Sequence, residues 1–234
     1  MYDKIILLKR EKEGLFMPNH TTNILKFEGK EEDVKRLLDS IRTEVKTDVE
    51  EFTRYIDFNK LIPMPESYEG LVSGSITDQA IAVYMAVERK DYTKINEMLK
   101  YPCWENAGVV TKEALIETLI NEHDATVELG RKYVENYEKY GAYTWYEWCN
   151  ENWGTKWNAY DQSFDEATNT IEFYTAWCGV PKLINMISEQ NPDVKIHYYY
   201  SVEGYSCSTR MEFLGGDLIF EDYDEESYDD EDYE

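Results

Sequence analysis

Hydrophobic and polar residues alternate in some short stretches of this chain and recur at helical spacing in others. In the second half of residues 17–29, apolar and polar residues alternate as far as Gly29, which predicts a β-strand. The stretch that follows places five apolar residues on one stripe of a helix, at Val34, Leu37, Leu38, Ile41 and Val45. We therefore expect a strand and then an amphipathic helix packed on a sheet. Before them, Ile5–Leu8 forms either a short edge strand or part of a variable leader.

Helical periodicity dominates the middle of the chain. Residues 75–141 are predicted to be mostly helical and to form an insertion between two halves of a sheet domain. Thr111 is predicted to cap a helix whose apolar stripe includes His123, so we expect His123 to be a hydrogen-bonded core residue. The preceding segment Ile56–Glu66 contains Pro63 and Pro65 and is predicted to be extended, without helix.

Strand patterns return in the last third of the chain. The predicted elements are strands at Thr170–Trp177, Val194–Val202, Arg210–Leu214 and Leu218–Phe220, a helix from Pro181, and a hairpin turn at Gly215-Gly216. This order predicts an α+β fold of ferredoxin-like type, with an antiparallel sheet and helices on one face. We expect residues 1–74 and 142–220 to be the two halves of that domain, 75–141 the helical insertion, and 221–234 a disordered acidic tail.

The charge of the chain narrows its possible partners. The formal net charge is −24 and the pI is near 4.4. Such a field repels phosphates and anionic lipids, so we expect neither direct nucleic-acid binding nor membrane binding. It attracts basic surfaces, so a basic protein is the expected partner.

Much of this charge lies at the end of the chain. Ten of the fourteen residues from Glu221 to Glu234 are acidic and none is basic. The tail is either a solubilising terminus or an interaction segment whose carboxylates imitate a nucleic-acid backbone. The residues predicted to make that contact are Asp222, Asp224, Glu225, Glu226, Asp229, Asp230, Glu231 and Asp232.

Motifs for metal binding or catalysis are missing from the sequence. The four cysteines are widely spaced and form no C-x-x-C pair, so we expect no metal site, no cofactor and reduced thiols. Nucleophile elbows, phosphate-binding loops and H-E-x-x-H are absent, which leaves an enzymatic role unsupported. The N-terminus reads as neither a signal peptide nor a membrane span, so a soluble, cytoplasmic protein is expected.

Residues 140–161 contain four of the six tryptophans. A helix is predicted to end near Asn152, with a sharp turn at Gly154. One interpretation is structural, with the tryptophans locking the helical insertion to the sheet. The other is an aromatic binding surface that has Lys156 and Asn152 as its polar groups. The candidate binding residues are Asn152, Trp153, Lys156, Trp157 and Trp177.

A further possibility is that bases stack on exposed tyrosines of an open sheet. Tyr174 and Tyr199 would be the stacking residues. Their neighbours Glu172 and Glu203 are acidic, and the basic rim that holds a nucleic-acid backbone is missing. This reading is therefore disfavoured.

Several stretches together resemble a known family. They are MPNHTTN (17–23), IDFNKLIPMPE (56–66), YGAYTWYEWCNENWGTKWNAYD (140–161) and FYTAW (173–177). They resemble the YubB-like ferredoxin-like domain family, which occurs in phages, prophages and conjugative plasmids and has no known function. The resemblance implies a ferredoxin-like fold and an accessory protein of a mobile element. It supplies no catalytic residues.

Charge and resemblance lead to one functional expectation. We expect a non-enzymatic interaction protein of a phage or mobile element that binds and inhibits a basic host protein, such as a nucleic-acid-binding defence factor. The alternative is a small-molecule-binding or enzymatic accessory protein that uses a Trp-rich pocket. The sequence leaves the oligomeric state open.

Overall fold

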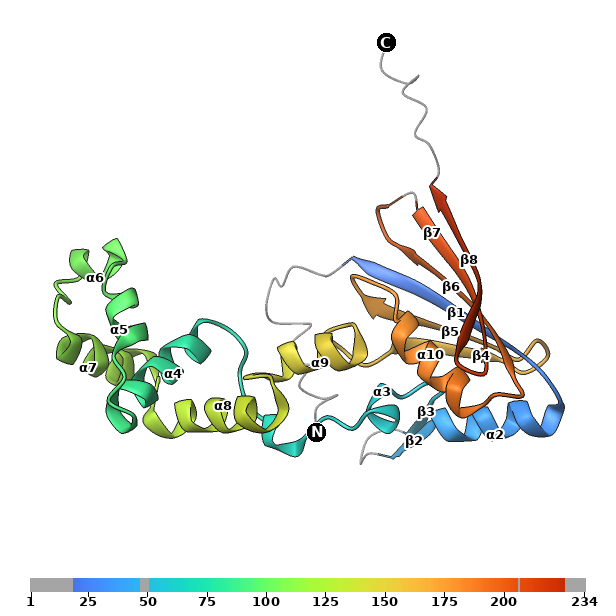
Figure 1. The fold of residues 1–234 in the computed structure, drawn as a ribbon, viewed down its shortest axis with the longest axis horizontal. Coiled ribbons are helices and arrows are strands. Elements are labelled where there is room, and N and C mark those ends of the chain that lie inside the picture. Colours follow the sequence, from blue (N-terminus) through green and yellow to red (C-terminus); the bar gives the residue numbers. More distant parts are fainter. Residues whose placement is uncertain (1–18, 47–50, 206, 226–234) are drawn as a thin grey trace, which may run out of the picture. The chain divides into compact units, whose positions relative to one another are not determined.

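The chain folds into two compact units that are interleaved in sequence (Figure 1). The computed structural model describes residues 19–46, 51–205 and 207–225. The described residues up to Leu61 and from Trp157 onward belong to the first, here called the sheet unit. Ile62–Lys156 form the second, here called the helical unit. The predicted insertion, 75–141, lies within the helical unit, and the predicted strand at Ile5–Leu8 lies outside the described residues.

The sheet unit contains a six-stranded antiparallel sheet in the order β4-β5-β1-β6-β7-β8. The strands are β1 (His20–Glu28), β4 (Tyr160–Asp165), β5 (Thr170–Ala176), β6 (Lys195–Val202), β7 (Cys207–Leu214) and β8 (Asp217–Glu225). The predicted strands near residues 23–28, 170–177 and 194–202 are confirmed, as is the hairpin at Gly215-Gly216. Strand β4 was not predicted. The α+β class with an antiparallel sheet is confirmed.

Two helices of the sheet unit each bury an apolar face. They are α2 (Glu31–Ile41) and α10 (Pro181–Gln190). The inward residues of α2 are Val34, Leu37 and Ile41, and α10 contacts β6, β7 and β8. On central strand β1, Leu25 and Phe27 are at most 2% exposed, whereas Lys26 and Glu28, which alternate with them, are exposed. Alternation along the strand therefore separates a core face from an open face.

Two predictions near these elements are wrong. Helix α2 stops at Ile41, and Val45 lies in strand β2 (Thr43–Lys46), which pairs with β3 (Glu51–Arg54). The segment Ile56–Glu66 is not wholly extended, because it contains helix α3 (Phe58–Leu61) and the first residue of the 3-10 helix η1 (Glu66–Tyr68).

The α3 turn is compatible with the prolines that follow it. The Asp57 carboxylate accepts the backbone N–H of Asn59 at 3.0 Å, which starts the turn as a helix cap does. The turn then ends before Pro63, the first residue that lacks an N–H group.

The helical unit confirms the prediction that residues 75–141 are mostly helical. Its helices are α4 (Ser75–Glu88), α5 (Thr93–Met98), α6 (Pro102–Asn106), α7 (Lys112–His123), α8 (Val127–Tyr140) and α9 (Trp145–Trp153). Thr111 caps α7 as predicted, with its hydroxyl accepting the Ala114 N–H at 3.2 Å. The core is built on α4 and includes Ile81, Leu119 and Tyr133. Among the described residues, no helix has the length and apolar character needed to span a membrane.

Candidate functional site

Residues 140–161, here called the Trp-rich stretch, contain a well-capped helix, α9. The Thr144 hydroxyl and the Glu147 carboxylate bond each other's backbone N–H groups, forming a capping box at its start. Gly154 ends the helix with a φ of 78°, the left-handed conformation that glycine adopts readily. The predicted helix end and turn are therefore confirmed.

Two of the predicted binding residues, Trp153 and Asn152, make contacts within the helical unit. The Trp153 side chain is 5% exposed, and its indole N–H donates to the Ile62 carbonyl oxygen at 2.9 Å. Its ring lies edge-on to Trp148, with centroids 5.6 Å apart. The Asn152 side-chain amide donates to the Trp148 carbonyl oxygen at 2.9 Å, within its own helix. These contacts are those of a packed core, so Trp153 and Asn152 have few polar atoms to offer a ligand.

Lys156 is the remaining polar residue predicted near the tryptophans. Its side chain is half-buried, and burial lowers the pKa of its ammonium group. Lys156 ends the helical unit, whereas Trp157 and Trp177 belong to the sheet unit.

Trp157 belongs to an aromatic cluster on the open face of the sheet. Its ring lies edge-on to Tyr160, with centroids 6.2 Å apart. His20 lies edge-on to Tyr160 and to Tyr174, at 5.8 Å from each, and the His20 Nδ1 is 2.8 Å from the Tyr160 hydroxyl. His20 therefore bonds a side chain of β4. From its sequence neighbours Asn19 and Asn23, His20 is predicted to lie in a polar turn, and this prediction is wrong because β1 begins at His20.

Trp177 lies at the same end of the sheet. It directly follows β5, and its backbone N–H donates to the Asn19 carbonyl oxygen at 3.0 Å, beside the start of β1. Its side chain is 48% exposed and its φ is 75°. This conformation costs a non-glycine residue roughly 1–2 kcal/mol, so the surrounding contacts must impose it.

A buried polar network holds the loop that carries Trp177. The Tyr198 hydroxyl donates to Asn23 Oδ1 at 2.6 Å and accepts the Val180 N–H at 2.7 Å. The Asn23 amide donates to the Thr175 hydroxyl at 2.9 Å, and that hydroxyl donates to the Cys178 carbonyl oxygen at 2.6 Å. Burial raises the pKa of Tyr198, which keeps its hydroxyl protonated. The network joins β1, β5 and β6 to the start of α10.

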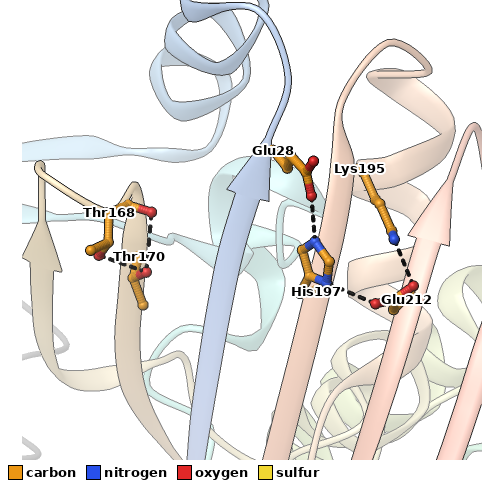
Figure 2. A network of polar contacts seen from close by, with 6 residues as sticks. All are labelled: Glu28, Thr168, Thr170, Lys195, His197 and Glu212. Carbon is orange, nitrogen blue, oxygen red and sulfur yellow. Dashed lines mark hydrogen bonds and ion pairs between the residues drawn. The ribbon is translucent and has the colours of Figure 1, made fainter.

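A second polar network lies on the open face and includes His197 (Figure 2). His197 Nε2 is 3.0 Å from Glu28 and its Nδ1 is 2.9 Å from Glu212, whose carboxylate also pairs with Lys195 at 2.7 Å. A carboxylate only accepts hydrogen bonds, so both contacts form fully when His197 carries two ring protons. The hydrogen bond from His197 holds the pKa of Glu28 below its usual range, and that from Lys195 does the same for Glu212. The alternation of residues 194–202 predicts that His197 is exposed on the polar face of its strand, whereas its side chain is half-buried and contacts two carboxylates.

The prediction for His123 is wrong. Its side chain is exposed at the end of α7 and lies edge-on to Trp104 at 5.6 Å. The α7 stripe reaches the core through Leu115 and Leu119, and the helix ends at His123 before another turn could bury it. His123, Trp104 and Cys103 line an open cavity of about 420 Å³ within the helical unit. Among the described residues, no three His, Cys, Asp or Glu side chains lie together as a metal site would need.

The acidic segment begins inside a strand. Residues 221–225 continue strand β8 and pair with β7 from Met211 back to Cys207, so the prediction of disorder from residue 221 is wrong for this part. The backbone hydrogen bonds of the sheet supply the order that acidic side chains alone do not give. The predicted contact residues Asp222, Asp224 and Glu225 lie in β8. The other predicted contact residues lie outside the described residues: Glu226, Asp229, Asp230, Glu231 and Asp232.

Residues 217–224 of strand β8 are all exposed. Its acidic side chains Asp217, Glu221, Asp222 and Asp224 are exposed, and we call these four residues the acidic edge. Apolar side chains lie among them: Leu218, Ile219, Phe220 and Tyr223 are 46–57% exposed. The contact residues predicted from the sequence do not include Asp217 and Glu221, and the prediction of a disordered tail did not place any of these charges on a strand. The signal was the apolar run at Leu218–Phe220 leading directly into the acidic segment.

Comparison with known proteins assigns a domain to the C-terminal third of the chain. Residues 156–234 match the family model described as the ferredoxin-like domain in Api92-like protein. The crystal structure of the protein Api92 from Yersinia pseudotuberculosis covers 90% of this chain and 98% of its own, at 10% sequence identity and a TM-score of 0.42. A search of curated proteins gave no match. The matched segment contains β4 to β8 and α10, so the expected ferredoxin-like domain is confirmed there.

Proposed function

We propose that this protein acts by binding a basic protein and that the acidic edge is its contact surface. The observation that carries the proposal is the exposure of Asp217, Glu221, Asp222 and Asp224 on one ordered strand at the edge of the sheet. A strand holds side chains of one face roughly 7 Å apart, so the carboxylates are positioned before the partner arrives. Such preorganisation lowers the entropic cost of binding.

The charge of the whole chain supports the same partner class. A net charge of −24 attracts a basic surface over long distances and repels nucleic acid. Carboxylates form charge-assisted hydrogen bonds with the lysines and arginines that elsewhere hold phosphates. The acidic edge would therefore compete with a nucleic acid for the basic cleft of a nucleic-acid-binding protein.

The family resemblance suggests where such competition would occur. YubB-like proteins occur in phages, prophages and conjugative plasmids, and the segment that matches the Api92-like model contains the acidic edge. We therefore place the protein in the cytoplasm of a bacterial host as a mobile-element factor. Its proposed target is a nucleic-acid-binding defence factor, which it would inhibit as a nucleic-acid mimic.

A ligand site or active site in the Trp-rich stretch is the less supported alternative. The indole N–H of Trp153 and the amide of Asn152 already bond backbone oxygens of the helical unit. A small molecule would have to break these contacts before it could use the same groups.

The test compares two variants that carry the same charge. In the first, D217N/E221Q/D222N/D224N, the acidic edge is neutral. In the matched control, E97Q/E105Q/E113Q/E117Q, four exposed carboxylates of the helical unit are neutral instead. Each is used with the wild-type protein to capture partners from a bacterial lysate at 50 mM and 500 mM salt, and each captured protein is then purified and its affinity measured.

A basic partner should be recovered by the wild type and by the control variant at low salt, and lost at high salt. The edge variant should bind the purified partner at least ten-fold more weakly than the control variant does. Equal losses in both variants would mean that total charge, and not the acidic edge, governs binding. Recovery of no basic protein would overturn the proposal.

A further inference from the structure

The position of β8 in the sheet indicates how the partner binds. We infer that β8 receives an extended basic segment of the partner, which adds to the sheet as a further strand. This inference rests on the proposed function and adds to it a binding mode and a ligand class. The segment is expected to carry lysine or arginine opposite the carboxylates and apolar residues opposite Phe220 and Tyr223.

The first argument is that β8 presents a backbone edge. It is the last strand in the sheet, and among the described residues it pairs only with β7. Every second residue of an edge strand directs its N–H and C=O groups outward, where another strand can bond them. Figure 1 shows β8 at this border of the sheet.

The opposite edge of the same sheet is covered. The Gln162 side chain of β4 bonds both the N–H and the C=O of Ile56, each at 2.9 Å. The rings of Tyr55 and Phe164 lie beside each other, with centroids 5.5 Å apart. The chain around residue 56 therefore lies along β4, whereas among the described residues no strand other than β7 pairs with β8.

The second argument is that the receiving edge is regular and held in place. Pairing with β7 shifts once, between Glu212 and Phe213, and is regular from Phe220 to Glu225. These six residues span roughly 20 Å, enough for a short added strand. At the start of β8, the Gly216 N–H donates to the Ser188 hydroxyl of α10 at 3.1 Å, which anchors the hairpin on the helix.

The third argument is the distribution of side chains on the two faces of β8. Glu221 and Tyr223 lie opposite Met211 and Thr209, so they share the core-facing side of β7. The opposite face of β8 carries Phe220, Asp222 and Asp224, which lie next to Glu212, Arg210 and Ser208 of β7. An incoming strand thus meets both a carboxylate and an aromatic ring on each face.

This distribution also argues against a second copy of the same chain. Two β8 strands paired around a two-fold axis would place carboxylates opposite carboxylates, because acidic residues occupy positions 221, 222 and 224. Natural edge strands often carry charge to prevent such pairing. Here the charge is acidic, so the same feature that discourages self-association favours a basic strand.

The test uses a defined probe, the acetylated and amidated peptide KVKVKVK. The control peptide has the same sequence with every internal residue N-methylated, which keeps the charge and removes most of the backbone hydrogen-bond donors. Affinity for the full chain is measured by calorimetry at low salt. Hydrogen exchange of residues 217–225 is measured with and without each peptide.

The unmethylated peptide should bind at least ten-fold more tightly than the methylated one and should slow exchange within 217–225. The D217N/E221Q/D222N/D224N variant should weaken its binding by a similar factor, whereas E97Q/E105Q/E113Q/E117Q should not. Equal binding of both peptides would overturn strand addition and leave the proposed charge contact standing. No binding of either peptide would also overturn strand addition, and the capture experiment would decide the proposed function separately. Protection of residues 217–225 without peptide, together with dimers in sedimentation, would identify a second copy as the occupant and overturn the inference.

Discussion

One hydroxyl group joins three segments of the sheet unit. The Tyr198 hydroxyl, on β6, accepts a hydrogen bond from Val180 at the start of α10 and donates one to Asn23 on β1. All three residues are at most 1% exposed. Water cannot replace a lost partner at such a position without entering the core, so the network should be costly to break.

Replacing Tyr198 with phenylalanine tests how much this hydrogen-bond network contributes to stability. The Tyr198→Phe variant leaves the Val180 N–H and the side-chain Oδ1 of Asn23 without their partner, and we expect the free energy of unfolding to fall by about 2–4 kcal/mol. Urea unfolding measures the difference. The control is Tyr199→Phe, the neighbouring half-buried tyrosine on the open face, which should change stability by less than about 0.5 kcal/mol. Equal effects in both variants would show that the network contributes little.

Prediction of individual site residues from the sequence was limited by what residue type alone conveys. The pattern located the turn at Gly154 because glycine has a distinct conformational role there. It did not separate Trp153, which is buried, from Trp177, which is 48% exposed. Both are tryptophans near a turn, and their difference arises from tertiary packing. The His20–Tyr160 contact joins residues 140 positions apart, so no local pattern could reveal it.

At the scale of elements, α4 and α8 approach each other closely at a glycine. A methyl group on Gly130 would lie 2.0 Å from the Ala80 carbonyl oxygen and 2.6 Å from the Tyr84 Cβ. Glycine normally weakens the middle of a helix by roughly 1 kcal/mol relative to alanine. Here it permits the close packing of the two helices that form the centre of the helical unit.

Gly130→Ala should therefore destabilise the protein despite its better helix propensity. We expect a net loss of roughly 2 kcal/mol or more, because the clash involves backbone that cannot move without separating the helices. Thermal unfolding followed by circular dichroism measures it. Lys132→Ala, at an exposed position of the same helix, is the control and should change little. A more stable Gly130→Ala variant would contradict the close approach.

The elements that the sequence predicted are those with clear apolar periodicity. Strands β1, β5 and β6 alternate, and α10 starts at a proline, so local rules suffice. Strand β4 was not predicted, because one of its inward positions holds Gln162 in place of an apolar residue. The Gln162 side chain there bonds the backbone of Ile56. Val45 continued the α2 stripe by chance, and only pairing with Phe52 reveals it as part of a hairpin.

At the scale of the whole molecule, the dominant property is charge. A net charge of −24 means that exposed carboxylates repel one another throughout the folded chain. Many of the salt bridges among the described residues, such as Arg42–Asp39 and Lys46–Glu51, join exposed side chains and offset little of this repulsion. Dissolved salt should therefore stabilise the fold by screening.

We expect the melting temperature to rise by roughly 3–8 °C between 20 mM and 300 mM sodium chloride. Differential scanning fluorimetry is sufficient to measure this. The E97Q/E105Q/E113Q/E117Q variant, with four fewer negative charges, should show a smaller rise. A melting temperature that stays constant or falls with salt would mean that favourable ion pairs outweigh the repulsion.

The interleaving of the two units has a consequence for synthesis. Asn23 on β1 bonds the backbone of Phe173 on β5, which lies 150 residues later in the chain. At about 5–20 residues per second, β1 leaves the ribosome roughly 8–30 s before its neighbour in the sheet exists. The helical unit is made in that interval and can fold from largely local contacts. The apolar side of β1, with Leu25 and Phe27, stays without its sheet partners meanwhile, so nascent chains should be most prone to chaperone capture or aggregation while the helical unit is being made.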